Sequence, residues 1–215
     1  MNQRQLSAHR PNRTRRAPLA WVAAGVASLV LVAGCASAAD APGAAPQGAP
    51  AAAAAAGSEA DAILAKLGLS GRSATDVITA LDQASDRQKD IFASVRYDKL
   101  VLKDGGTETQ VALPADKFYL SVAPYVNQTH ECFYHSLTTC TGELANQNVD
   151  VKIVDSTGKT LVEGTQKTYA NGFVGFWLPR DIEGTITVTS EGRSATSAIS
   201  TGKESATCLA TLQLT

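Results

Sequence analysis

The sequence predicts an α+β protein in which a small N-terminal helical segment precedes an antiparallel β-sandwich-like domain. Helical spacing of apolar residues dominates residues 58–98, and short runs with period-two alternation follow from residue 99. Seven or eight such runs are separated by turn residues roughly every ten positions, which is typical of a sandwich. We therefore expect a helical annex at 58–98 and a β-rich domain at 99–215.

The first 57 residues predict export and anchoring rather than a folded unit. Residues 1–34 combine five arginines with an apolar run at 19–33 that is short for a membrane span. The run ends in Val32-Ala33-Gly34-Cys35, which resembles the lipobox of bacterial lipoproteins. That resemblance implies a signal peptide at 1–34 and acylation of Cys35; a plain secretory peptide with Cys35 as a spare thiol is the alternative.

Residues 36–56 are almost entirely Ala, Pro and Gly, so we expect a flexible tether over 35–57. A lipid on Cys35 would attach this tether to a membrane. The expected location is therefore extracytoplasmic and membrane-anchored, in the periplasm or on the outer face of the cell membrane.

Charge and motifs exclude several functions. Of the 19 lysines and arginines, five lie in residues 1–34, which hold no acids, so the rest carries 14 basic against 20 acidic residues. An acidic chain without a basic stripe argues against nucleic-acid binding. The Gly-x-Ser-x-Gly elbow of many hydrolases is absent from the sequence, and we expect no enzymatic turnover.

Three short helices are expected in the annex. Ser58 opens the first and Gly68 ends it, Ser73 caps the second, and the third covers residues 86–95. Helices this short need a packing partner. The sequence leaves the role of these helices open between packing on the β domain, spacing and homodimerisation.

Turn residues define the expected strands. Three hairpins are predicted, at Asp104-Gly105-Gly106, at Asn171-Gly172 and at Glu191-Gly192. Further strands are expected at 118–123, closed by Pro124, and around Val149, Val151 and Ile153. In the last strand, period two places Leu209, Thr211 and Gln213 on one face and Ala210, Leu212 and Leu214 on the other. Over roughly the last third of the chain, the order of these features resembles a transthyretin-like or carboxypeptidase-regulatory-like module, and the expected sandwich is of transthyretin-like or Ig-like type.

Residues 129–140 concentrate metal-ligand chemistry. Two thiols and two imidazoles lie there, and a third thiol lies near the C-terminus: His130, Cys132, His135, Cys140 and Cys208. Soft sulfur with imidazole suits copper(I) or zinc. A Cys132–Cys140 disulfide with bystander histidines explains the same residues, and spacing alone does not decide.

Extended backbone places His130 and Cys132 on one face. His135 has the opposite parity unless the chain bends at Phe133-Tyr134. Parity therefore favours His130 as the partner of Cys132.

Several motifs together resemble the CueP family of periplasmic copper-binding proteins. They are Thr129-His130-Glu131-Cys132, His135-Ser136-Leu137-Thr138-Thr139-Cys140 and residues 118–126, 142–144, 171–181 and 207–214. The resemblance implies copper resistance outside the cytoplasm, with copper bound by Cys132, Cys140 and Cys208.

The resulting hypothesis is a protein that sequesters copper or hands it on. Copper(I) is the expected ion, with His130 and His135 completing or neighbouring the thiolate site. Copper(II) is the alternative ion, and its reduction would couple to disulfide formation. A periplasmic copper acceptor or a disulfide oxidoreductase is the expected partner. The rival hypotheses are a thiol–disulfide exchange protein using Cys132 and Cys140, and a disulfide-stapled scaffold.

Overall fold

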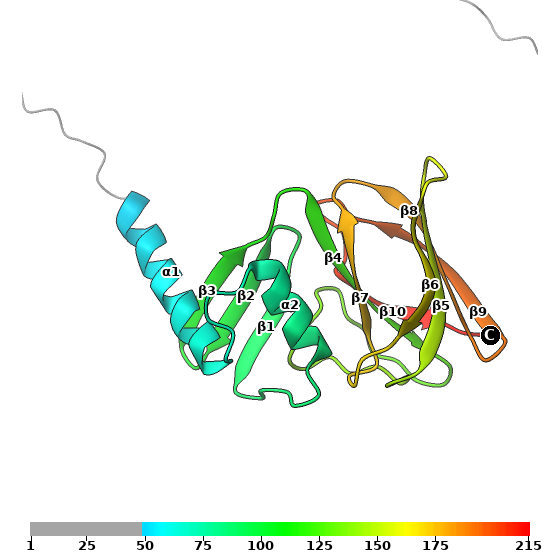
Figure 1. Cartoon of the computed structure of the whole chain (residues 1–215), viewed down its shortest axis with the longest axis horizontal. Coiled ribbons are helices and arrows are strands. Elements are labelled where there is room, and N and C mark those ends of the chain that lie inside the picture. The colour runs from blue at the N-terminus through cyan, green and yellow to red at the C-terminus, as the bar shows by residue number, and fades with distance from the viewer. Residues whose placement is uncertain (1–48) are drawn as a thin grey trace, which may run out of the picture. The chain divides into compact units, whose positions relative to one another are not determined.

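The computed structural model describes the backbone of residues 49–215 and the side chains of residues 57–215. The predicted signal peptide, Cys35 and most of the predicted tether lie outside the described residues. Within this part, two helices, α1 (Ala49–Lys66) and α2 (Ala74–Gln83), precede ten strands (Figure 1). The strands are β1 Ile91–Val95, β2 Lys99–Asp104, β3 Thr107–Ala112, β4 Lys117–Tyr125, β5 Asn148–Asp155, β6 Thr160–Lys167, β7 Val174–Pro179, β8 Glu183–Ser190, β9 Arg193–Ser200 and β10 Cys208–Gln213. The predicted α+β class is confirmed.

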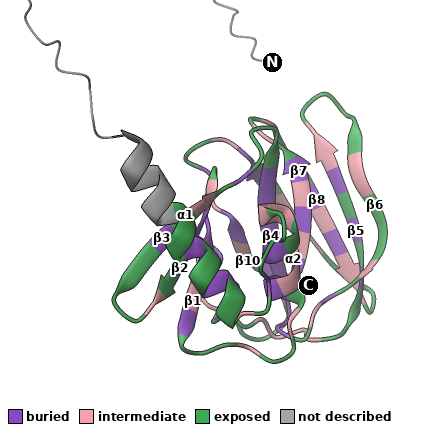
Figure 2. Ribbon diagram, turned by 60° about the vertical axis from the view of Figure 1, so that its left-hand side comes forward, coloured by how far each residue is buried: buried purple, intermediate pink, exposed green. Residues whose placement is uncertain are grey.

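The strands form three sheets, and two of them make a sandwich. The sheets have the orders β1-β2-β3, β10-β4-β7 and β6-β5-β8-β9. The second and third share one core, to which β5 contributes by strict alternation of buried and exposed residues (Figure 2). Its inward residues are Val149, Val151 and Ile153, each at most 2% exposed.

The two helices pack on the first sheet and form a second core. Helix α1 supplies Ile63 and Leu64, and α2 supplies Val77, Ile78 and Leu81. The Ser73 side chain accepts a hydrogen bond from the Asp76 N–H at 3.2 Å and caps α2 as predicted. The apolar faces of the helices are thus buried within the chain itself.

Strand β4 lies between the two cores and is buried on both faces from residue 118 to residue 124. Phe118, Leu120 and Val122 face the sandwich core, whereas Tyr119 faces the helices. A strand buried on both sides needs a near-continuous apolar run, which residues 118–124 supply with Ser121 as the one polar interruption. The strand also continues through Pro124, where the sequence predicted its end.

Two predictions about the annex are wrong. Residues 91–95 form strand β1 rather than a third helix, because Ile91, Ala93 and Val95 bury their side chains while their backbone pairs with β2. Helix α1 begins at Ala49, inside the predicted tether. Alanine is the best helix former, and Pro50 lies in the first turn, where its missing N–H costs nothing.

The predicted hairpins at Asp104-Gly105-Gly106 and Glu191-Gly192 are confirmed, but the one at Asn171-Gly172 is wrong. Strand β6 pairs with β5 and β7 pairs with β4, so this turn carries the chain from one sheet to the other. Gly172 has φ +80°, and a Cβ there would lie 2.3 Å from the Gly142 carbonyl oxygen. The turn is therefore fixed by its contact with the 142 segment rather than by strand pairing.

Strand β10 runs parallel to β4, and this pairing departs from the predicted antiparallel pattern. Its register shifts between Leu209 and Leu212, so that two residues of β10 oppose one residue of β4. Cys208 and Ala210 therefore pack away from the sandwich core, whereas Leu212 and Leu214 enter it. The predicted parity of the last strand fails at this bulge, and without the bulge Cys208 would face the sandwich core.

The close approach at Gly172 can be tested with alanine. We expect Gly172→Ala to lower the free energy of unfolding by roughly 3 kcal/mol or more, because the new methyl group meets backbone at a positive φ. Gly158→Ala is the matched control, since Gly158 has φ +87° and open space around it, and should cost only about 1 kcal/mol. Equal losses in urea denaturation would contradict the packing argument.

Candidate metal centre

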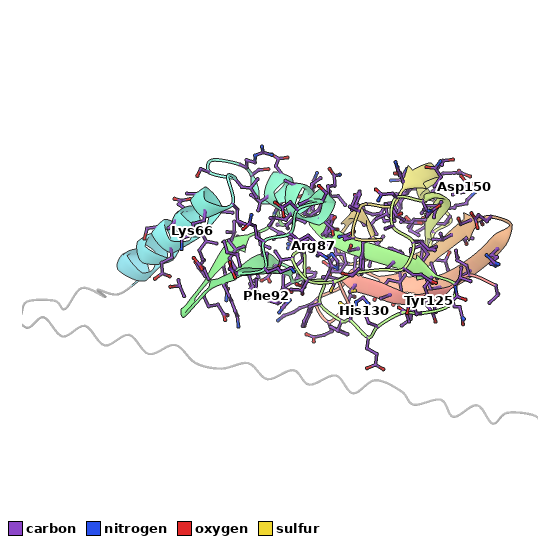
Figure 3. All side chains as sticks on the ribbon, turned by 90° about the horizontal axis from the view of Figure 1, so that it is seen from below. Lys66, Arg87, Phe92, Tyr125, His130 and Asp150 are labelled. Carbon is purple, nitrogen blue, oxygen red and sulfur yellow. The ribbon has the colours of Figure 1, made fainter. Side chains whose placement is uncertain are left out.

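The predicted donors come from two places in the chain and meet on one side of β4. His130, Cys132, His135 and Cys140 lie in the loop that joins β4 to β5, which we call the donor loop (residues 126–147). Cys208 begins β10. Figure 3 shows His130 beside the paired β4 and β10 ribbons. Cys132 and Cys140 pack against a third small cluster, formed by Ala123, Phe173, Cys208 and Ala210.

The sulfur atoms are close together but not bonded. Cys132, Cys140 and Cys208 are free thiols, and the Cys132 and Cys140 Sγ atoms lie 3.4 Å apart. The Ser136 N–H donates to Cys140 Sγ at 3.4 Å. The disulfide considered from the sequence is not formed in the structure.

Nitrogen donors join these sulfur atoms in two overlapping groups. Donor atoms of His130, Cys132 and Cys140 lie within 4.8 Å of one another, and so do those of Cys132, His135 and Cys208. The chain bends at Phe133 and Tyr134, as a role for His135 required. Parity favoured His130, but the structure brings both histidines to the thiols.

Thr207 fixes the approach of β10 to the donor loop. Its hydroxyl accepts the His135 backbone N–H and donates to the Val95 carbonyl, each at 3.0 Å. The Phe133 carbonyl accepts the N–H groups of Thr207 and Cys208 at 3.0 and 3.2 Å. Cys208 is therefore held through its backbone.

Arg87 holds the turn that carries Cys140. Its guanidinium donates to the carbonyls of Leu137 at 2.8 Å, Ser136 at 3.4 Å and Cys140. The Cys140 N–H closes the same turn onto the Ser136 carbonyl at 3.1 Å. The arginine thus orders this thiol and places a positive charge near it.

His135 is fully buried, and its orientation is set by Asp82 of α2. His135 Nε2 lies 2.8 Å from Asp82 Oδ1, and both side chains are 0% exposed. The carboxylate also accepts hydrogen bonds from Tyr119 at 2.7 Å, Ser121 at 3.0 Å and Asn171 at 2.8 Å. Because Nε2 is engaged, Nδ1 is the nitrogen that can reach the thiols, an arrangement typical of metal-binding histidines.

These contacts shift the pKa values of Cys140, Cys208 and His135 in different directions. Hydrogen bonds from Cys132 and Cys208, assisted by His135, lower the pKa of the Cys140 thiol. Cys132, Cys140 and burial raise the pKa of Cys208. Burial alone would lower the pKa of His135, but the Asp82 carboxylate and the neighbouring thiols raise it well above its usual range. The metal-free cluster therefore favours a thiolate at Cys140 near a positively charged imidazole.

Sequence reasoning missed Asp82, Arg87, Asn171 and Thr207. Asp82 follows Ile78 by four positions and so lies on the apolar face of α2, where an acid is a signal that it has a buried partner. Arg87 falls in the segment that was predicted to be a third helix. The contacts that these four residues make within the site join positions that are distant in sequence.

A β-sandwich with a helical support and a cluster of three thiols and two imidazoles defines a class of protein equipped to bind soft metals. Residues 76–213 match the family model described as periplasmic copper-binding protein CueP. The chain belongs to the CueP family of periplasmic copper-binding proteins.

A solved structure supports the same conclusion. The crystal structure of S.CueP is 42% identical in sequence, with a TM-score of 0.70, and the match covers 72% of this chain and 96% of that one. No curated protein matches the chain significantly. Among the described residues, no helix is long and apolar enough to cross a membrane.

Because Asp82 of α2 orients His135, we predict that Asp82→Asn loses metal affinity. We expect metal affinity to fall by roughly 10–100-fold, because an amide holds His135 less firmly than the carboxylate does. Direct titration of both proteins with copper(I) under anaerobic conditions measures the change. Asp86→Asn, at an exposed position in the following loop, is the control and should bind as the wild type does. If Asp82→Asn binds copper(I) as tightly as the wild type, Asp82 does not orient His135 for metal binding.

Glu143 predicts a pH dependence of stability. The side chain and N–H of Asn127 and the N–H of Val126 donate to its carboxylate and lower its pKa to about 2. This lies below the value of about 4.3 in an unfolded chain, so the stabilisation is present above that pH and is lost as the pH falls towards 2.

We therefore expect Glu143→Gln to lower the melting temperature at pH 7. Its difference from the wild type should narrow as the pH falls from about 5 to about 2, which calorimetry can follow. Glu163→Gln removes an exposed carboxylate that pairs with Lys152 at 3.0 Å, and serves as the control. A difference that stays constant with pH would rule out this role of Glu143.

Proposed function

We propose that this protein binds copper(I) outside the cytoplasm and either sequesters it or hands it on. The observation that carries the proposal is the meeting of three free thiols and two imidazoles on one side of β4. Thiolates with imidazole select copper(I), zinc and related soft ions over calcium or magnesium. Membership of the copper-binding family favours copper among them.

The ligands in this proposal are Cys132, Cys140 and Cys208, with His130 and His135 alongside. Neither donor group includes a carboxylate, and the sequence offers no methionine except Met1. Binding would not require a large rearrangement, because the donor atoms of each group already lie within 4.8 Å.

Reduction of copper(II) is the proposed side reaction. Two copper(II) ions would each accept one electron, a sulfur–sulfur bond would form between Cys132 and Cys140, and two thiol protons would leave for solvent. The 3.4 Å separation of these sulfur atoms favours this pair. The reaction consumes the thiols, so it is stoichiometric and the protein is not an enzyme.

The anchor and the partner belong to the same proposal. A lipid on Cys35 and the following Ala/Pro-rich residues would hold the copper centre near a membrane. A periplasmic acceptor or a disulfide oxidoreductase would then approach the donor loop. Phe133 and Tyr134 are 52% and 40% exposed and directly follow Cys132, so they offer an apolar contact at the point of transfer.

Thiol–disulfide exchange is a second candidate, supported by the close Cys132–Cys140 pair and the lowered pKa of Cys140. The metal-free reduced protein, used in substoichiometric amounts with glutathione, would then speed the reduction of insulin disulfides. Copper sequestration alone predicts no acceleration.

The copper proposal is tested by single serine substitutions. We expect Cys132→Ser, Cys140→Ser and Cys208→Ser each to weaken the binding of at least one copper(I) ion tenfold or more, since each removes a soft ligand. Anaerobic competition with a coloured copper(I) chelator measures the affinity. Glu131→Gln, next to Cys132 but outside both donor groups, should bind normally. Unchanged affinity in all three serine variants would refute the proposal.

A further inference from the structure

The five donors form two sets that share a single sulfur. We call His130, Cys132 and Cys140 the outer set, and Cys132, His135 and Cys208 the inner set. Cys132 is the common member. Each set also has one thiol and one imidazole of its own.

The two sets differ in burial. All three outer residues are half-buried, and His130 borders a cavity of about 190 Å³ that Thr141 and Glu143 also line. In the inner set His135 is 0% and Cys208 4% exposed. The outer set is therefore the more accessible of the two to a metal ion from solvent.

Each set contains a buried nitrogen that has no hydrogen-bond partner. These atoms are His130 Nε2 in the outer set and His135 Nδ1 in the inner set. An unsatisfied buried polar atom destabilises the folded protein, so two of them beside the same thiols require an explanation. One copper(I) ion held by the three thiolates would leave both nitrogens unsatisfied.

The charge of the site also favours two copper(I) ions over one. Three thiolates around one copper(I) leave a net charge of about −2 in a partly buried site, and two copper(I) ions reduce it to about −1. The Asp82 carboxylate, fully buried next to His135, makes further negative charge there costly. A second ion therefore neutralises charge as well as satisfying a nitrogen.

We propose that the centre holds two copper(I) ions at once, bridged by the Cys132 thiolate. The inner ion is bound by Cys132, Cys208 and His135, and the outer ion by Cys132, Cys140 and His130. The inner position fills first, because Asp82 and Thr207 already orient its ligands. The outer ion is the last to bind and the first to leave. This inference rests on the proposed copper function and adds the number, place and order of the ions.

The test is a stepwise anaerobic titration of the reduced, metal-free full chain with copper(I). Native mass spectrometry counts the bound ions, and X-ray absorption detects copper–copper scattering. We expect two ions in the wild type, with copper–copper scattering at two equivalents and not below one. His130→Gln, at a half-buried side chain with a free Nε2, should hold one ion without that scattering.

Two further variants keep the test decisive. Cys140→Ser should also hold one ion, so a folding defect in the His130 variant would not leave the proposal untested. Glu131→Gln, which removes a neighbouring negative charge outside both sets, should keep two ions and the scattering.

Saturation of the wild type at one ion would overturn this inference and leave the proposed copper function intact. Two ions with copper–copper scattering in both His130→Gln and Cys140→Ser would also overturn it. Absence of copper(I) binding by the wild type would refute the proposed function itself.

Discussion

The buried carboxylate of Asp82 is the contact on which the rest of the structure depends. It accepts hydrogen bonds from Tyr119 and Ser121 of β4, from Asn171 at the turn between the sheets, and pairs with His135 of the donor loop. An ion at 0% exposure is tolerable only when its lone pairs are satisfied in this way. The pairing with His135 lowers the pKa of Asp82 against the opposing effect of burial. Helix α2 and the metal centre therefore form a single cooperative structure.

Strand β4 transmits this constraint to the sandwich. Its two faces belong to different cores, so the position of α2 on one face is coupled to sheet packing on the other. The bulge in β10 completes the arrangement, since it turns Cys208 towards the donor loop while Leu212 still fills the sandwich core. One irregular step in one strand thus decides whether the third thiol can take part in a metal site.

Sequence reasoning succeeded where the signal is local. Alternation located β5, and the Ser73 cap located α2. The donors were found because cysteine and histidine are scarce and clustered. It failed where a distant partner decides. Asn171-Gly172 carries a strong hairpin signal, yet contact with Gly142 and Asp82 makes it a crossing between sheets. Arg87 and Asp82 have no local motif, and the β10 bulge has no marker in a run of ordinary strand residues.

The donor loop is held by its backbone, and this leaves its side chains free for a ligand. Arg87 binds carbonyls around Cys140, Thr207 binds the N–H of His135, and Glu143 binds N–H groups near its start. The donor His135 is also fixed through its side chain, at the nitrogen that faces away from the thiols. Such preorganisation spares the ordering entropy that a flexible loop would lose on binding. The unpartnered imidazole nitrogens and close thiols are stable in the metal-free protein because the surrounding scaffold, rather than the donors themselves, determines the shape of the loop.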